Sequence, residues 1–299
     1  MKSHLARFLG GALLGIGLAL PAPAQPLEVT VSIPPQRYFV QRIGGAAVTV
    51  NTMVRPGASP HEYEPTPQQM AALSRSRAYF AIGVEFEKAW LPRFRSAAKG
   101  LEVVDTLRGI ERLPMTEPRS AGGTHSHDLE HGGADPHVWL SPPLVRLQAM
   151  NIRDALIRLD PARAAEYRRN HDAFAREVNR IDEAVMAALA GAPPERRRFL
   201  VFHPSWGYFA RAYGLTELAI EVDGKEPGPR QLAAVIDIAR KENIRVIFVQ
   251  PQFSRKSADA VARALGARIA TLDPLAEDWG ANLQAAAQAL GAALDQGSR

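Results

Sequence analysis

The sequence predicts an α/β protein with two lobes, each built on a mostly parallel sheet, and a long helix that links them. Short runs rich in β-branched residues alternate with amphipathic runs of helix length, once before residue 110 and again after residue 197. This alternation is typical of parallel sheets with helices on their faces. Between the two regions, residues 142–189 have the apolar spacing of helices only. We therefore expect four parts: a signal peptide (1–24), an N-terminal lobe (25–140), linking helices (141–192) and a C-terminal lobe (193–299).

The first lobe contains four predicted strands, each a short and mostly apolar run bounded by turn residues. They are Leu27–Ile33, Val48–Val54, Ala78–Gly83 and Leu101–Asp105. The segments between them have helical spacing over Gln36–Ile43, Pro67–Arg75 and Lys88–Ala98. Residues 119–135 break the pattern, because RSAGGTHSHDLEHGGAD is rich in Gly and His and has no apolar period. That composition predicts a loop within the N-terminal lobe.

The linking segment Pro142–Leu189 is rich in Ala, Arg, Glu and Leu. The pair Asp160-Pro161 is typical of an N-cap and a first helical residue, so we expect two helices. The second would run to Ala190, which is roughly 45 Å at 1.5 Å per residue and longer than a small domain is wide. This length favours a helix that spans both lobes; a helical hairpin inside one domain is the alternative.

The second lobe repeats the alternation of the first. Its predicted strands are Arg198–Phe202, Leu218–Val222, Val246–Gln250 and Arg268–Leu272. Its predicted helices are Ser205–Tyr213, Gly228–Glu242, Ser254–Leu265 and Leu275–Leu294. Ligands of open α/β sheets bind beyond the carboxyl ends of the strands. The residues that follow each strand are therefore the first candidates for a functional site.

The first 24 residues have the features of a signal peptide. Lys2 and Arg7 supply positive charge, residues 8–20 are apolar, and Ala22-Pro23-Ala24 is a small-residue cleavage site. The apolar run is short for a membrane span, although an uncleaved anchor is the alternative. No Cys lies at the cleavage point, which excludes lipid attachment there. We expect a protein released into the periplasm.

The composition restricts the chemistry that is available. The chain has no Cys, so disulfides and thiolate metal sites are excluded and a metal would need His and carboxylate ligands. The formal net charge is only +5, and the densest basic run, Arg196–Arg198, precedes an apolar segment. Such a run is more typical of a solvated strand flank than of a nucleic-acid contact. We therefore expect no nucleic-acid partner.

Four residues that can bind a metal lie at or beyond predicted strand ends. His61 follows the second strand, and His137 lies directly before the linking segment. In the second lobe His203 and Asp273 each end a strand. Three imidazoles and one carboxylate form a four-ligand set, in which imidazole suits zinc and oxygen suits harder ions. Each residue alone has an ordinary alternative, a surface or hydrogen-bonding role for the His and a cap or turn for Asp273. Together they predict one metal site between the lobes.

The neighbours of these residues have expected roles as well. Pro60 and Pro136 restrict the backbone before two of the His residues. The candidate acceptors for imidazole N–H groups are Glu62, Glu64 and Asp135. Surface exposure is the favoured alternative for Glu62 and Glu64. Trp139, Trp206 and Tyr208 are candidates for keeping water out of the cleft, with plain core packing as an equal alternative.

A second His cluster lies in the loop 119–135. Its members, His125, His127 and His131, have the spacing H-x-H-x3-H. We predict that they collect metal weakly before transfer, while a solvated loop with incidental His is the alternative. His171, within the linking helix, is expected at the surface.

Several segments, in this order, resemble one known family. They include VRPGASPHEYEPTPQQM, DPHVWLSP, VFHPSWGYFARAYGL, VIFVQPQFS and IATLDPLAEDW. The chain resembles the metal-binding cluster of substrate-binding proteins of ABC transporters, most closely the periplasmic zinc-binding ZnuA-like proteins. The resemblance covers nearly all of the mature chain. It implies two Rossmann-like lobes, a rigid linking helix and a metal at their interface, held by His61, His137, His203 and Asp273.

The resemblance also implies a function without catalysis. A monomer would capture Zn²⁺ and deliver it to an ABC permease and its ATPase at the inner membrane. Manganese-binding relatives typically carry Glu where this chain has His203, which favours zinc and leaves manganese as the alternative. The chain departs from several relatives in having no disulfide and a shorter His-containing loop.

Two other classes of function are the rivals. A zinc hydrolase needs an open metal position and a base; Glu62 is the only obvious base, and no H-E-x-x-H motif occurs. A binding protein for an organic ligand or siderophore needs a large cleft lined by polar and aromatic groups.

Overall fold

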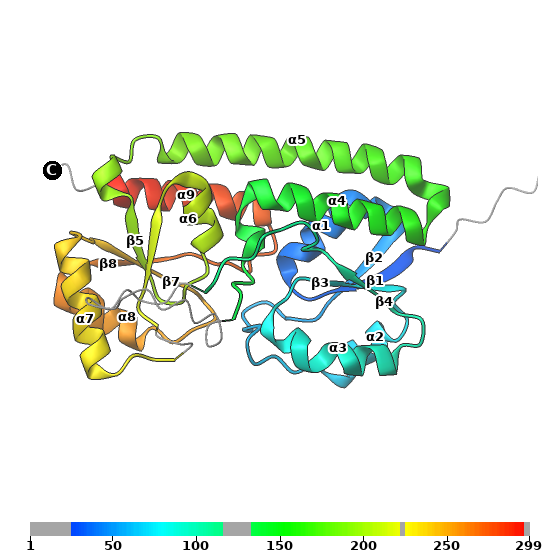
Figure 1. The fold of residues 1–299 in the computed structure, drawn as a ribbon, viewed down its shortest axis with the longest axis horizontal. Helices are drawn as coiled ribbons and strands as arrows, with labels where there is room; N and C mark the ends of the chain where they lie inside the picture. Colours follow the sequence, from blue (N-terminus) through cyan, green and yellow to red (C-terminus); the bar gives the residue numbers. More distant parts are fainter. Residues whose placement is uncertain (1–24, 116–132, 222–224, 296–299) are drawn as a thin grey trace, which may run out of the picture.

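Two α/β lobes lie side by side along one long helix in the computed structural model (Figure 1). The structure describes residues 25–115, 133–221 and 225–295. The predicted signal peptide and the cluster His125, His127 and His131 lie outside these residues, so both stay predictions.

The N-terminal lobe is built on a parallel four-stranded sheet with the order β2-β1-β3-β4. The strands are β1 (Leu27–Val31), β2 (Val48–Thr52), β3 (Ala78–Ala81) and β4 (Glu102–Asp105). Helix α1 (Pro34–Gly44), followed by the 3-10 turn η1 (Gly45–Ala47), lies on the side of the long helix, while α2 (Pro67–Leu73) and α3 (Glu85–Ala97) cover the other face (Figure 1). The carboxyl ends of these strands therefore all meet at one edge.

The C-terminal lobe repeats this topology with the order β6-β5-β7-β8, again all parallel. Its strands are β5 (Arg198–Val201), β6 (Thr216–Ala219), β7 (Val246–Val249) and β8 (Arg268–Thr271). Its helices are α6 (Gly207–Tyr213), α7 (Pro229–Lys241), α8 (Lys256–Leu265) and α9 (Trp279–Asp295), and the 3-10 turn η4 (Pro194–Arg196) precedes β5. The predicted α/β class with parallel sheets is confirmed for both lobes.

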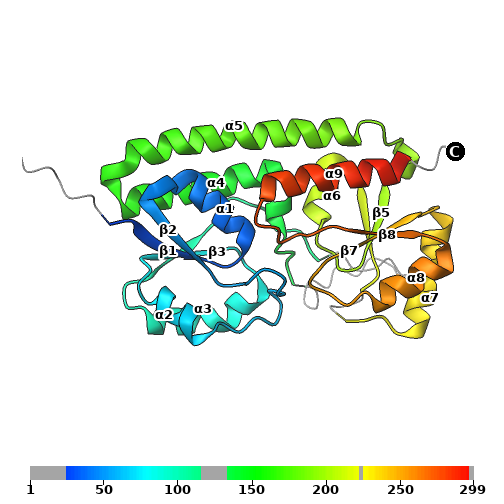
Figure 2. The same cartoon turned by 180° about the vertical axis from the view of Figure 1, so that it is seen from behind.

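The linking helices are α4 (Pro142–Leu159) and α5 (Ala164–Leu189). Helix α5 has 26 residues, about 39 Å at 1.5 Å per residue. It packs on α1 and α4 beside the first lobe and on α9 beside the second, as Figures 1 and 2 both show. The predicted helix that spans both lobes is thus present. The division of the chain at residues 140 and 192 stays a prediction.

The hydrophobic core is continuous from one lobe to the other. One buried cluster includes Val31 in β1, Phe174 in α5, Trp279 in α9 and Phe248 in β7. A smaller cluster lies within the C-terminal lobe around Val235 and Val261, in α7 and α8. Because apolar side chains of both lobes share one core, separating the lobes would expose that surface to water. The lobes are therefore expected to move little relative to each other.

Three elements begin or end at other residues than the sequence predicted. Residues Pro161–Arg163 form the 3-10 turn η3, so α5 begins at Ala164. Helix α9 begins at Trp279 because the carboxylate of Asp278 accepts the N–H of Ala281, as an N-cap does. Strand β6 begins and ends earlier than predicted.

The prediction that His171 lies at the surface is wrong, because the residue is buried. It lies on α5 between Tyr167 and Phe174, which are also buried. Residues three and four apart share one helix face. The inward stripe of α5 therefore includes His171, and residue type alone did not show this.

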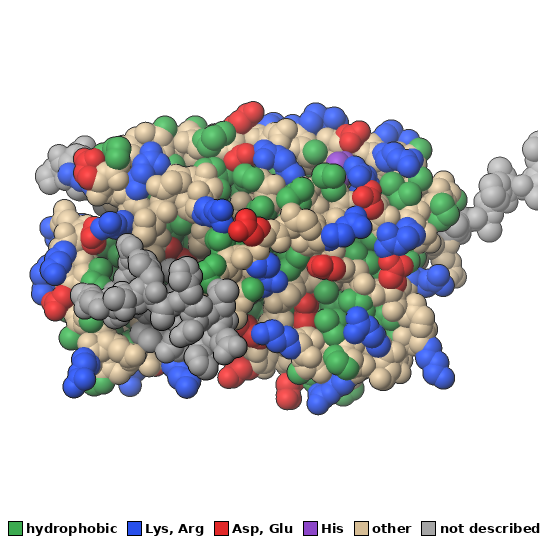
Figure 3. Space-filling view, in the orientation of Figure 1, with side chains coloured by type: hydrophobic (Ala, Val, Ile, Leu, Met, Phe, Trp, Pro, Cys, Tyr) green, Lys and Arg blue, Asp and Glu red, His purple; other side chains and the backbone are tan. Residues whose placement is uncertain are grey.

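Charged side chains on the face drawn in Figure 3 are dispersed rather than gathered over one element. Lys and Arg there alternate with acidic and neutral groups. Arg196 and Arg197 directly precede β5 and are half-buried, while Arg198 is exposed, begins the strand and pairs with Glu242.

Candidate metal centre

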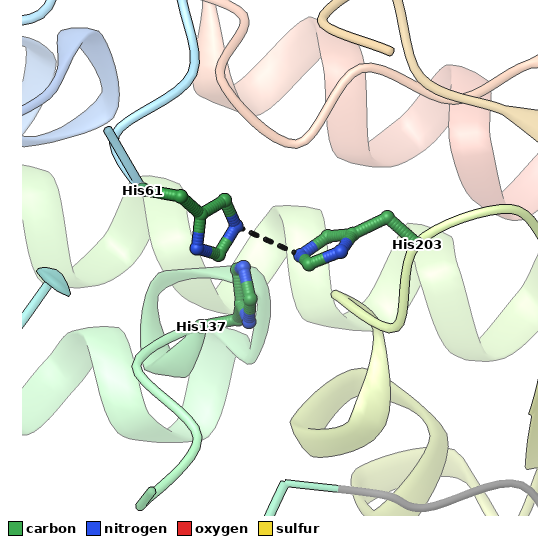
Figure 4. A group of neighbouring side chains, drawn as sticks. All are labelled: His61, His137 and His203. Carbon is green, nitrogen blue, oxygen red and sulfur yellow. Dashed lines mark hydrogen bonds between the residues drawn. The ribbon is translucent and has the colours of Figure 1, made fainter. Parts of the chain in front are cut away.

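Three His side chains converge between the lobes (Figure 4). His61 lies in the loop that joins β2 to α2, His137 directly precedes the 3-10 turn η2 (Val138–Leu140), and His203 follows β5. One ligand nitrogen of each ring lies within 4.8 Å of the others. Three of the four predicted residues thus come together, and His61 and His203 lie beyond the carboxyl ends of strands, one from each sheet.

Each of the three rings is hydrogen-bonded through Nδ1 to a carboxylate. His137 Nδ1 lies 2.7 Å from Asp135 Oδ1, and His203 Nδ1 lies 3.0 Å from Glu221 Oε1. His61 Nδ1 pairs in the same way with Glu85. An ionised carboxylate only accepts hydrogen bonds, so each Nδ1 carries a proton, and in the neutral ring Nε2 then presents a lone pair. Metal-binding His residues have this arrangement.

The distance between two of these rings supports the same interpretation. Nε2 of His61 lies 3.0 Å from Nε2 of His203 (dashed line in Figure 4). If both Nδ1 atoms carry protons, the two Nε2 atoms are both acceptors, and their lone pairs repel each other. A dication between them removes that repulsion. In tetrahedral zinc sites with Zn–N of about 2.0–2.1 Å, ligand nitrogens lie about 3.3 Å apart, close to this spacing.

Electrostatics favour neutral imidazole at His203. Burial lowers the pKa of His203 to about 4, against the opposing effect of its hydrogen bond to Glu221. Only the neutral ring can bind a metal, so His203 stays ready to do so in mildly acidic solution. Burial alone would raise the pKa of Glu85, but the hydrogen bond from His61 and the nearby imidazoles lower it instead.

The backbone around His203 is fixed by buried polar side chains. The His203 N–H donates to Gln250 Oε1, and Gln250 Nε2 donates to the His203 carbonyl. The next residues, Ser205 and Trp206, both donate their N–H groups to Glu217. Burial raises the pKa of Glu217 to about 8. The turn that carries His203 is therefore held from two neighbouring strands.

Asp273 lies near this cluster but not within it. It is not among the residues whose ligand atoms lie within 4.8 Å of one another. Its Oδ1 accepts hydrogen bonds from Gln252 Nε2, at 2.8 Å, and from the Leu275 N–H, at 2.9 Å. Gln252 and Leu275 themselves line the small cavity that the three His rings share. Asp273 as the fourth ligand therefore stays a prediction.

The other residues proposed from sequence have mixed outcomes. Asp135 is a carboxylate partner of an imidazole, as expected, while Glu62 and Glu64 are exposed. Trp139 lines the cavity, and Trp206 and Tyr208 are buried near it. Glu85 and Glu221 were missed, although Glu85 follows β3 and Glu221 follows β6. The strand-end rule that selected the His residues would have selected these acids too.

Comparison with known proteins extends this picture to the whole chain. Residues 29–293 match the family model described as zinc-uptake complex component A, periplasmic (ZnuA). The chain belongs to the ZnuA family. The match covers both lobes and the linking helices, so every described residue of the His cluster and its carboxylate partners falls inside it.

Individual relatives of this ZnuA-family chain are named for different metals. It is 30% identical to the iron-binding protein YfeA of Yersinia pestis, over 82% of this chain and 76% of that protein. It is 28% identical to the manganese-binding lipoprotein MntA of Halalkalibacterium halodurans, over 82% and 77%. A crystal structure of a zinc-bound ZnuA deletion mutant is 43% identical, with a TM-score of 0.82 over 90% of this chain and 98% of the other. The names of relatives therefore do not decide the metal.

Among the described residues, no helix is both long and apolar enough to span a membrane.

Proposed function

We propose that this chain is a periplasmic solute-binding protein that captures Zn²⁺ between its lobes and delivers it to an ABC importer. The observation that carries the proposal is the set of three imidazoles whose Nδ1 atoms all face carboxylates. Such a set turns the three Nε2 lone pairs toward one ion. Imidazole nitrogen suits zinc better than manganese, which favours oxygen.

Asp273 completes the proposed ligand set. Asp273 follows β8 and His203 follows β5, so both lie at the carboxyl edge of the C-terminal sheet. Leu275, two residues after Asp273, lines the cavity that the three His rings share. Four protein ligands would leave no position for an activated water, unlike a catalytic zinc site. The proposal therefore includes no enzymatic step.

Delivery is proposed to proceed without a large hinge motion. The shared core and helix α5 restrain the lobes, so release would depend on local movement of the loops that carry the ligands. The partners would be a permease and its ATPase, and the mature protein would act as a monomer. The loop with His125, His127 and His131 is proposed to collect metal before transfer.

Calorimetric titration of the mature apo protein with Zn²⁺ and Mn²⁺ tests the function. We expect one zinc ion per chain, bound with a Kd below about 1 μM, or roughly 8 kcal/mol, and weaker binding of manganese. The matched variant His203→Glu replaces one nitrogen by oxygen and is expected to shift the preference toward manganese. Wild-type protein that does not bind zinc at micromolar concentration would refute the proposal.

A further inference from the structure

Gln252 occupies an unusual place beside the His cluster. It lies in the loop that follows β7, and its side chain lines the cavity shared by His61, His137 and His203. Its Nε2 donates to Asp273 Oδ1 at 2.8 Å. Its Oε1 is buried and has no hydrogen-bond partner among residues 25–115, 133–221 and 225–295. A buried acceptor without a partner is rare in proteins and calls for a reason.

The orientation of this amide has a chemical explanation. If the amide were flipped, Oε1 would face Asp273 Oδ1, and two acceptors would lie in contact. The side chain therefore has one favourable orientation, which satisfies Asp273 and leaves Oε1 unpaired. In this orientation the hydrogen bond to Asp273 stabilises the fold by more than the unpaired oxygen of Gln252 costs.

Asp273 is restrained at three points. Both hydrogen bonds described for its carboxylate, from Gln252 and from the Leu275 N–H, end on Oδ1. Its backbone carbonyl accepts a hydrogen bond from Asn282 Nδ2 at 2.7 Å. With Oδ1 occupied twice, the oxygen left to bind a metal is Oδ2.

The number of oxygens that Asp273 contributes bears on the choice of metal. Zinc in closed protein sites takes four ligands in a tetrahedron. Manganese prefers carboxylate and water oxygens in larger coordination shells. Three imidazoles and one carboxylate oxygen fit the first case, and a carboxylate that binds through both oxygens moves the site toward the second.

We propose that Gln252 is a positioning residue that determines metal selectivity, because it restricts Asp273 to binding through one oxygen. The metal centre then stays four-coordinate and prefers zinc over manganese. This inference rests on the proposed function, and in particular on Asp273 as the fourth ligand. Gln252 would thus influence which metal is bound without being a metal ligand itself.

The test uses Co²⁺ as a spectroscopic probe in the mature protein. Four-coordinate Co²⁺ absorbs visible light much more strongly than five- or six-coordinate Co²⁺. We expect the strong spectrum for wild type and a weaker one for Gln252→Leu, which keeps the side-chain bulk without hydrogen bonds. Competition titrations with Zn²⁺ and Mn²⁺ should show the ratio of the two affinities falling about tenfold in the variant, the lower end of the range for residues that orient metal ligands.

The matched control is Asn282→Ala, which removes a hydrogen bond to the Asp273 backbone and leaves both carboxylate contacts in place. We expect it to keep the four-coordinate spectrum and the wild-type affinity ratio. Circular dichroism of each apo variant checks its fold, and Gln252→Ala serves if the Leu variant does not fold.

The outcomes separate this inference from the proposed function. An unchanged spectrum and ratio in both Gln252 variants would overturn the inference while zinc binding stands. An equal change in Asn282→Ala would also overturn it, because the effect would then be general loosening of Asp273. A wild-type protein that does not bind zinc refutes the function itself.

Discussion

Two imidazole–carboxylate pairs of the metal centre, one from each lobe, differ in how firmly the protein holds them, while the third pair, His137 with Asp135, is buried like that of His203. The N-terminal arm, His61 with Glu85, is partly exposed, with 23% and 45% of the side chains accessible. The C-terminal arm, His203 with Glu221, is almost fully buried, with 4% and 5% accessible. Phe253 also stacks on the ring of His203, with the planes 22° apart.

This difference assigns different tasks to the two arms. The C-terminal arm is already in place before a metal arrives, because its backbone, ring and carboxylate are all fixed. In the N-terminal arm, His61 lies on a loop, and water can reach the carboxylate of its partner Glu85. We expect the metal to be held by the C-terminal arm and released through movement of the N-terminal arm.

Removal of one imidazole is expected to have the largest effect. Structural zinc sites are worth about 10–16 kcal/mol over four ligands, so one ligand is worth about 3 kcal/mol, or roughly a hundredfold in Kd. We expect both His61→Ala and His203→Ala to lose that much zinc affinity in competition titrations. Only His203→Ala should also lower the thermal stability of the apo protein, because it leaves Glu221 buried without its partner. Equal stability losses would contradict the contrast between the arms.

The buried acid beneath the C-terminal arm should make stability depend on pH. The pKa of Glu217 is about 8 in the folded protein, well above that of an unfolded Glu, so the folded state holds a proton that the unfolded state releases. The contribution of Glu217 to the free energy of unfolding is then fully present below about pH 4.5 and is lost as pH rises toward 8. Between pH 5 and 7 the loss is on the order of 2–3 kcal/mol.

Urea unfolding of the apo protein at the two pH values measures this loss. Glu217→Gln, which keeps an acceptor for Ser205 and Trp206 but cannot ionise, should lack that part of the dependence. A variant with the same pH dependence as wild type would show that Glu217 is ionised in the fold.

The carboxylate partners of the two arms should differ in a smaller effect. Replacing the carboxylate that orients a metal-binding His costs about 10–100-fold in affinity. We expect Glu221→Gln, which keeps an acceptor but loses the charge beside a buried ring, to lie in that range, and Glu85→Gln to lie below it because water screens the exposed pair. Zinc titrations of the two variants give the comparison directly. A larger effect for Glu85→Gln would reverse the assignment of the arms.

The smallest expected effect concerns the loop of the N-terminal arm. Pro60 restricts the backbone beside His61, and Pro60→Gly would loosen it at a cost of about 0.4–1 kcal/mol. This corresponds to a two- to fivefold faster release of zinc, measured by stopped-flow transfer to a chelator. Pro136→Gly, beside the buried His137, serves as the comparison and should change release less.

The sequence predicted the elements and the three His residues because both follow from local pattern. His61, His137 and His203 lie next to strands or helices whose apolar period is plain. The rule that ligands bind beyond the carboxyl ends of strands selected His61 and His203, whereas His137 precedes η2 and α4 and follows no named strand.

The pairing of Glu221 and Glu85 with particular His residues could not be predicted in this way. Glu221 reaches His203 because β6 is the neighbour of β5, and strand order is a property of the folded sheet. Glu85 reaches His61 although β3 and β2 are not neighbours. His171 was misplaced for a related reason, since the buried stripe of α5 is defined by what packs on it.

Two indole N–H groups connect the segments around the site. Trp139 Nε1 donates to the Pro274 carbonyl, and Trp279 Nε1 donates to the Trp139 carbonyl. The Trp139 ring is fully buried, and its centroid lies 5.1 Å from that of His137. A natural fluorophore thus stands beside the ligands, so we expect the ultraviolet emission of the unlabelled protein to change when an ion arrives.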